Sequence, residues 1–158
     1  MKACVVDASV AIKWYIPEVH HESALELLTL QRRGEVWLHI PDLFLSETAN
    51  ILWKKFRSGE LDLRQTGEIA SALRAVPKTV HSSEVLQPAA LDLACATSRT
   101  VYDCLYLTLA ASLGCKLVTA DQKLYRALRN TRWQSLVCWV EEISKVARDP
   151  AREHDPGA

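Results

Sequence analysis

Apolar positions along the chain fall into two alternating patterns. Short apolar runs such as ACVV at residues 3–6 are typical of buried strands, whereas longer runs with apolar residues three or four positions apart indicate helices. Strands are predicted at residues 3–6, 36–40, 79–81, 116–119 and 136–138. Helices are predicted at residues 22–33, 42–57, 61–75, 84–98, 102–113 and 122–128.

The alternation of strands and helices predicts the fold class. Parallel neighbours in a sheet need a long crossover connection, which is usually a helix, so we expect an α/β fold: a three-layer α/β/α sandwich around a central, mostly parallel sheet. The length of 158 residues predicts a single domain, over residues 1–147. Residues 148–158 include two prolines and almost no apolar side chains, which predicts a disordered tail.

Composition and charge narrow the class of protein. The hydrophobic share of 49% and the charged share of 24% are those of a globular protein. Nineteen basic residues balance nineteen acidic ones, which excludes a protein that coats nucleic acid through a basic excess and leaves only a local patch for such binding. The first residues do not form an export signal, and no apolar run approaches the ~20 residues of a membrane helix, so we expect a cytoplasmic protein.

The cysteines support the same compartment. They form an odd set without a C-x-x-C pair, which argues against a disulfide framework and against a thiolate zinc site. All five lie in apolar runs, so they are predicted to be buried free thiols in a reducing cytoplasm: Cys4, Cys95, Cys104, Cys115 and Cys138.

Several common catalytic motifs are excluded by the glycines. The chain has five glycines, and none are spaced as in a dinucleotide-binding fingerprint, a phosphate-binding loop or the G-x-S-x-G turn of hydrolases. Carboxylate side chains remain as the candidate catalytic or metal-binding groups.

Two aspartates follow predicted strands. Asp7 comes directly after ACVV, and Asp121 comes directly after KLVTA at residues 116–120. The carboxyl ends of parallel strands are where open α/β sheets bind ligands. Each aspartate could equally be an ordinary helix N-cap, and for either one alone this is the more common role.

Two further acids occupy unusual helical positions. Glu47 shares a helix face with the apolar Leu43, Phe44 and Ile51, so its carboxylate is predicted to face inward. Asp103 is the only charged residue of an apolar helix and is predicted to be largely buried. For each alone, a position at the rim that reaches solvent remains open.

Four carboxylates at one edge of a sheet would repel each other unless a divalent cation neutralised them. Oxygen ligands favour Mg²⁺ or Mn²⁺ over Zn²⁺, and such an ion makes phosphodiester hydrolysis the natural reaction.

Other side chains offer weaker candidates. The histidines are scattered and lack the spacing of a metal site. The five tryptophans are more typical of a core or a subunit interface than of base stacking. Two basic clusters follow the Glu47 helix and Asp121, and either could be a solvated face or hold a phosphate backbone: Lys54, Lys55 and Arg57, and Lys123, Arg126, Arg129 and Arg132.

Four stretches together resemble the PIN domain, and specifically the VapC-type toxins of toxin–antitoxin modules: VVDASVAIKWYIPE, PDLFLSETANILWK, TVYDCLYLTLA and LVTADQKL. The resemblance spans residues 3–140. It implies an endoribonuclease that depends on Mg²⁺ or Mn²⁺, forms a homodimer, cleaves RNA and is neutralised by a small VapB-like antitoxin.

The resemblance also implies roles for individual residues. The acidic quartet of the family falls on Asp7, Glu47, Asp103 and Asp121. Its hydroxyl residues near the metal fall on Ser9 and Thr119. Some relatives carry a further acid just after the last aspartate, where Gln122 and Lys123 stand here, which leaves a second metal ion open.

Three alternatives compete with a nuclease. A catalytically weak PIN-like RNA-binding or adaptor protein would keep the fold without cleavage. A phosphatase with an aspartyl nucleophile would need a second aspartate where Ser9 stands, and a phosphorylation receiver would need an acidic pair early in the chain.

Overall fold

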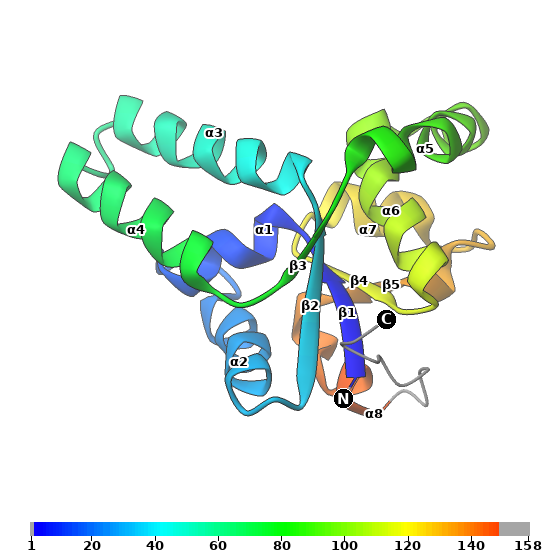
Figure 1. Cartoon of the computed structure of the whole chain (residues 1–158), viewed down its shortest axis with the longest axis horizontal. Helices are drawn as coiled ribbons and strands as arrows, with labels where there is room; N and C mark the ends of the chain where they lie inside the picture. The colour runs from blue at the N-terminus through cyan, green and yellow to red at the C-terminus, as the bar shows by residue number, and fades with distance from the viewer. Residues whose placement is uncertain (1, 149–158) are drawn as a thin grey trace.

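The computed structural model describes residues 2–148. Its centre is a five-stranded sheet in the order β3-β2-β1-β4-β5, and every strand pair is parallel. The strands are β1 (Lys2–Val6), β2 (Val36–Pro41), β3 (Thr79–His81), β4 (Lys116–Thr119) and β5 (Val137–Trp139). Cys4 on β1 is in register with Leu38 on β2 and Lys116 on β4. The predicted three-layer α/β/α class is confirmed, with helices on both sides of the sheet (Figure 1).

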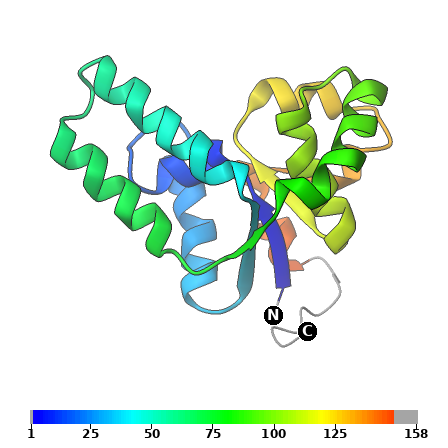
Figure 2. The same cartoon turned by 45° about the horizontal axis from the view of Figure 1, so that its top comes forward.

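Helices provide the crossovers between the strands. The α-helices are α1 (Ala8–Ala11), α2 (His21–Arg32), α3 (Leu43–Arg57), α4 (Leu63–Ala75), α5 (Ser83–Thr97), α6 (Val101–Leu113), α7 (Gln122–Leu128) and α8 (Ser144–Arg148). Short 3-10 turns are η1 (Ile12–Trp14), η2 (Gln134–Leu136) and η3 (Val140–Glu142). The helices α2 and α6 lie on opposite sides of β1 and β2, whereas α3 and α4 form an arm that projects from the sheet (Figures 1 and 2).

The core lies where α6 covers the middle of the sheet. Val5 on β1, Leu117 on β4 and Leu107 on α6 have no exposed surface, and α6 packs against β1, β2 and β4. Gly114 ends α6 with a φ of 62°, which allows the chain to turn directly into β4. The apolar face of α6 therefore fixes the carboxyl ends of β1 and β4 next to the start of that helix.

The boundaries of the elements follow local capping. Asp62 and Gln65 form a reciprocal capping box, so α4 begins at Leu63 rather than at the predicted residue 61. Ser98 adopts a left-handed φ of 55° and ends α5 one residue before the predicted boundary. The prediction missed α1 and α8, because four or five residues show no helical periodicity.

One cysteine prediction is wrong. Cys95 is exposed, because it lies on the solvent side of α5, while the other four cysteines are buried. All five are free thiols, as predicted.

Two other predictions concern the C-terminal tail and helices that could span a membrane. The predicted tail lies outside the described residues, apart from Arg148, which ends α8. Within residues 2–148, no helix has both the length and the apolar character needed to cross a membrane.

Candidate active site

Asp7 lies at the carboxyl end of β1 and caps α1. Its backbone N–H donates to the carbonyl of Val118 at 3.0 Å, which holds the end of β1 against β4. Its Oδ2 accepts hydrogen bonds from the hydroxyls of Ser9 (2.8 Å) and Thr119 (2.6 Å), and its Oδ1 accepts from the backbone N–H of Ser9 (3.3 Å). The ordinary capping role is therefore real, and the same carboxylate also faces the cavity described below.

Ser9 and Thr119 link the ends of β1 and β4. The Ser9 hydroxyl accepts the backbone N–H of Ala120 at 3.0 Å, and the Thr119 hydroxyl accepts that of Asp121 at 3.0 Å. Thr119 is fully buried. Both predicted hydroxyl residues thus contact the Asp7 carboxylate and position the chain that leads to Asp121.

Asp121 caps α7 through one of its oxygens. Oδ1 accepts the backbone N–H groups of Lys123 (2.8 Å) and Leu124 (3.0 Å). Both capping bonds use the same oxygen, so the carboxylate is held in one orientation at the carboxyl end of β4.

Glu47 and Asp103 reach the same region from α3 and α6. The hydroxyl of Tyr106 donates a hydrogen bond to Oε2 of Glu47. The backbone N–H of Asp103 donates to the Thr100 hydroxyl, which caps α6, at 3.1 Å. Asp103 is only partly buried, which corrects the prediction that it is largely buried. The reason is its place in the first turn of α6, at the edge of the apolar interface.

The four acids line one cavity of about 260 Å³. They come from the end of β1, from α3, from α6 and from the start of α7. The other lining residues are Ala8, Ser9, Asn50, Ile51, Lys54, Tyr106 and Leu124. The four acids that the sequence placed at one edge of the sheet do line one cavity, but the sequence analysis did not identify Asn50 or Tyr106 as residues of this site. Both lie three residues after a predicted acid on the same helix, a spacing that could have revealed them.

Burial and mutual repulsion alter the acidity of three carboxylates. Desolvation is the largest influence and raises the pKa of Asp7, Glu47 and Asp103 above their ordinary values. The charge of Asp121 raises the pKa of Asp7 and Asp103 further, and the charges of Asp7 and Asp103 raise that of Glu47. Hydrogen bonds from Ser9, Thr119 and Tyr106 oppose these effects. The site is therefore an electrostatically coupled set that favours a bound cation.

The donor set suits a hard divalent ion. The four acidic side chains that line the cavity offer only carboxylate oxygens as ligands, and no histidine or cysteine lines it. Across residues 2–148, no three histidine, cysteine or acidic side chains lie close enough together to hold an ion between them. Mg²⁺ commonly keeps several waters and takes only one or two carboxylates, so the residues fit a hydrated ion rather than a fully enclosed one.

The basic clusters divide between the site and the surface. Lys54 lines the acidic cavity, and Lys123 lines an adjoining cavity of about 420 Å³ that shares Asp103 and Asp121 with it. Lys55 instead forms ion pairs with Glu18 and Glu60. Only part of each predicted cluster is therefore placed to meet a substrate.

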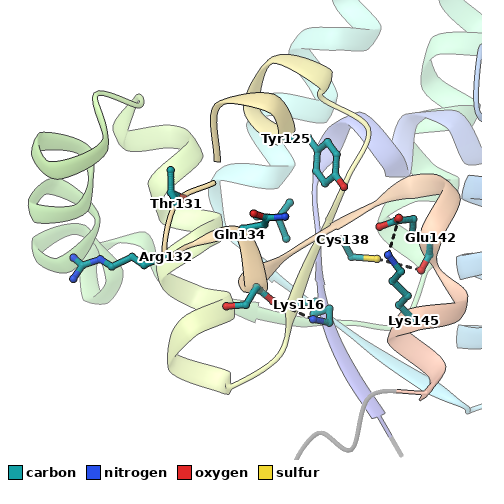
Figure 3. A pocket seen from close by; sticks show the side chains of 10 residues that line it. Lys116, Tyr125, Thr131, Arg132, Gln134, Cys138, Glu142 and Lys145 are labelled. Atoms are coloured by element: carbon teal, nitrogen blue, oxygen red, sulfur yellow. Dashed lines mark hydrogen bonds and ion pairs between the residues drawn. The ribbon is translucent and has the colours of Figure 1, made fainter. Parts of the chain in front are cut away.

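A separate cavity of about 480 Å³ lies at the opposite end of β4 (Figure 3). Lys116 begins β4 there, and Lys145 pairs with Glu142 at 2.7 Å. None of the four acids lines this cavity. Its volume alone does not make it the site, because the coupled carboxylates lie at the other edge of the sheet.

The tryptophans and histidines take largely structural positions. Trp14 is in the core, and its indole N–H donates to the carbonyl of Ala24 at 3.0 Å. Trp53 is half-exposed beside Arg57. His39 and His81 hydrogen-bond to each other at 2.9 Å on β2 and β3, away from the acids.

Fold and site together define an α/β protein with an acidic centre at the carboxyl edge of a parallel sheet. Residues 4–129 match the PIN domain, and the chain belongs to this family. Within it, the chain is of the VapC type: it is 38% identical over 123 residues to Ribonuclease VapC3 of Pyrobaculum aerophilum, covering 76% of this chain and 90% of that protein. The crystal structure of PAE2754 from Pyrobaculum aerophilum is similar in fold, with a TM-score of 0.67 and 25% identity, over 94% of this chain and 91% of that one.

Proposed function

We propose that the chain is an endoribonuclease that depends on Mg²⁺ or Mn²⁺ and hydrolyses RNA phosphodiester bonds. The observation that carries this proposal is the convergence of four carboxylates, from four separate elements, on one cavity. Membership of the PIN family and the likeness to a named ribonuclease support RNA as the substrate. A single domain, residues 1–147, carries the activity.

The acids divide into two roles toward the ion. Asp7 and Asp103 would bind it directly, because both carboxylates are partly withdrawn from water and desolvation disfavours their charged forms unless a cation lies beside them. Glu47 and Asp121 would complete the set through water, since no three acidic side chains within residues 2–148 lie close enough together to hold the ion between them. When bound, the ion supplies charge stabilisation at the phosphate and lowers the pKa of water.

The neighbouring side chains position this set. Ser9 and Thr119 hold the Asp7 carboxylate by hydrogen bonds of 2.8 and 2.6 Å. Glu47 and Asp121 would orient the attacking water opposite the leaving 3′ oxygen, and the Glu47 carboxylate would accept a proton from that water. Lys54 is placed to offset the negative charge of the phosphate.

The decisive experiment compares the wild type with Asp103→Asn, which preserves the shape of the side chain and removes its charge. We expect the purified wild-type protein to cleave labelled RNA when Mn²⁺ is added and to lose this activity when EDTA removes the ion. The variant should lose at least ~10²-fold in rate, the scale of losing an electrostatic catalytic element. A folded Asp103→Asn that cleaves at the wild-type rate would overturn the proposal and favour the adaptor alternative.

The biological role follows from the family. We propose that the protein acts in the cytoplasm as the toxin of a type II toxin–antitoxin system and that a VapB-like antitoxin inhibits it. An arginine of the antitoxin would enter the acidic cavity, because a guanidinium binds carboxylates through paired charge-assisted hydrogen bonds. Co-expression should abolish both toxicity and RNA cleavage, and an antitoxin that binds without inhibiting would contradict this mechanism.

We further propose a homodimer in which two-fold pairing aligns the two sites along one groove. Light scattering at micromolar concentration should give the mass of two chains. A monomer mass would contradict the assembly without affecting the cleavage experiment.

A further inference from the structure

The short link between α5 and α6 presents an arginine beside the acidic cavity. Ser98 ends α5, where its backbone N–H donates to the carbonyl of Ala94 at 2.9 Å, and Thr100 caps α6. Arg99 lies between these two caps, and α5 and α6 pack against each other along their lengths. The backbone that carries Arg99 is therefore fixed by hydrogen bonds on both sides.

The guanidinium of Arg99 has an unsatisfied donor. Its Nε is buried and has no hydrogen-bond partner within residues 2–148. An arginine side chain stays charged, so it cannot relieve this cost by losing a proton. A buried donor without an acceptor is destabilising. Because the same side chain lines the cavity described next, a shift of the guanidinium toward an acceptor bound there would remove the penalty. The planar fork of donors suits a phosphate oxygen in particular.

The surroundings of Arg99 identify the kind of anion. Arg99 and Lys123 line the 420 Å³ cavity together with the hydroxyl residues Ser98 and Thr100. The same cavity contains Asp103 and Asp121, which also line the acidic cavity. A small free anion would be repelled by these two carboxylates. A nucleic acid strand would be retained if one of its phosphates were held at the acidic cavity through a bound cation and the next phosphate lay beside Arg99. The single strand would then occupy both cavities.

We propose that Arg99, assisted by Lys123, forms a subsite for the RNA backbone phosphate next to the scissile one. This inference rests on the proposed function, since it assigns a second contact for the same substrate. Arg99 is a positioning residue for the RNA strand and takes no part in bond breaking. Phosphate contacts of this kind set the register of a nucleic acid without reading its sequence.

The test measures binding of a fluorescein-labelled 12-nucleotide oligouridylate by anisotropy in EDTA, where metal-dependent cleavage is prevented. The variants are Arg99→Ala and Arg99→Lys, with Arg33→Ala as the matched control. Arg33 follows α2 on the surface, and its loss removes the same charge far from the acidic edge. We expect Arg99→Ala to weaken binding about five- to tenfold and Arg33→Ala to leave it within about twofold.

Salt dependence separates a phosphate contact from a structural role. Loss of one phosphate contact to single-stranded RNA should reduce the slope of log K against log salt by about 0.7 in Arg99→Ala. Arg99→Lys should keep most of the slope, because it keeps the charge, yet bind more weakly than wild type because it loses the fork. In cleavage assays with Mn²⁺, Arg99→Ala should raise KM while kcat stays within about twofold.

The outcomes distinguish this inference from the proposed function. If wild type cleaves RNA while Arg99→Ala keeps the wild-type affinity and salt slope, the subsite is wrong and the nuclease stands. If wild type does not cleave RNA with Mn²⁺ but binds it, and Arg99→Ala alone reduces the slope, the subsite stands and the proposed reaction fails. If wild type does not bind RNA, the subsite is wrong as well.

Discussion

At the scale of single residues, Tyr106 determines how Glu47 faces the cavity. The phenol is buried, and its hydroxyl donates to one oxygen of the Glu47 carboxylate. Burial, followed by the charges of Asp7 and Glu47, raises the pKa of Tyr106 far above its ordinary value, so it remains a hydrogen-bond donor at any working pH. The hydrogen bond lowers the pKa of Glu47, against the effect of burial.

We expect Tyr106→Phe to reduce the rate of RNA cleavage by about tenfold, because it removes this donor and keeps the ring. The loss of the bond raises the pKa of Glu47, so the acidic limb of the pH–rate profile should move to higher pH. Tyr102→Phe is the control, because Tyr102 lies on the same helix but is exposed. A Tyr106→Phe profile that coincides with that of Tyr102→Phe would show that the hydroxyl does not act on Glu47.

Asp103 links catalysis to stability. Its folded-state pKa is raised, so its ionised form destabilises the fold: the penalty is absent below the pKa of the unfolded chain, about 3.9, and complete above the raised folded value. In EDTA, Asp103→Asn should therefore unfold at a higher temperature than wild type at pH 7. The difference should shrink as the pH falls toward 4.

Added Mn²⁺ should reverse this order. A ligand at 100 times its Kd stabilises the folded state by about 2.7 kcal/mol, so wild type should gain stability with Mn²⁺ while Asp103→Asn gains little. Thermal unfolding monitored by circular dichroism provides both measurements. Equal stabilisation of the two proteins by Mn²⁺ would contradict direct ligation by Asp103.

At the scale of elements, the arm of α3 and α4 must be held against the body of the protein for Glu47 and Lys54 to reach the site (Figure 1). Glu18, in the loop after η1, pairs with Lys55 near the end of α3 and with Lys13 on η1 at 3.1 Å. Lys55 also pairs with Glu60, beyond the end of α3, at 2.8 Å. These ion pairs connect the arm to the segment that follows the central strand.

We expect Glu18→Gln to lower the free energy of unfolding by about 1 kcal/mol at pH 7. The two lysines lower the pKa of Glu18 despite its partial burial, so its contribution is present above the unfolded-chain pKa and is lost as the pH falls through the folded value. Urea titrations should therefore show a smaller difference at pH 3 than at pH 7.

The control for this arm contact is Glu68→Gln. Glu68 pairs with Arg64 one turn away on α4, and both side chains are exposed, so the expected cost is at most about 0.5 kcal/mol. If Glu18→Gln costs no more than Glu68→Gln, the ion pairs of Glu18 do not anchor the arm.

The same elements show what the sequence could predict. The strands and long helices were predictable because their apolar residues repeat with a clear period, and Asp7 and Asp121 were found because they follow buried strands. The helix-capping role of Asp7 was open from the sequence, because it is a local contact with Ser9. Its hydrogen bond with the Thr119 hydroxyl was not predictable, since it depends on the pairing of β1 with β4 across 112 positions. The role of Arg99 depends likewise on the packing of α5 against α6 rather than on a motif.

At the scale of the whole molecule, zero net charge leaves binding of nucleic acid to local groups. Three cationic side chains line the two adjoining cavities: Lys54, Arg99 and Lys123. Other basic side chains are engaged elsewhere, as Lys55 is by Glu18 and Glu60 and Lys13 is by Glu18. The protein should therefore bind RNA through contacts with few phosphates, and its overall charge should not attract RNA over long distances.

This arrangement predicts a shallow salt dependence for RNA binding. Three phosphate contacts to a single strand give a slope of log K against log salt of about −2, which corresponds to a roughly twentyfold loss of affinity between 50 and 200 mM salt. Anisotropy titrations of wild type with a labelled oligoribonucleotide in EDTA measure this slope directly. A slope steeper than about −4 would require at least twice as many phosphate contacts as these cavities provide. RNA would then have to extend over a surface beyond the acidic edge of the sheet.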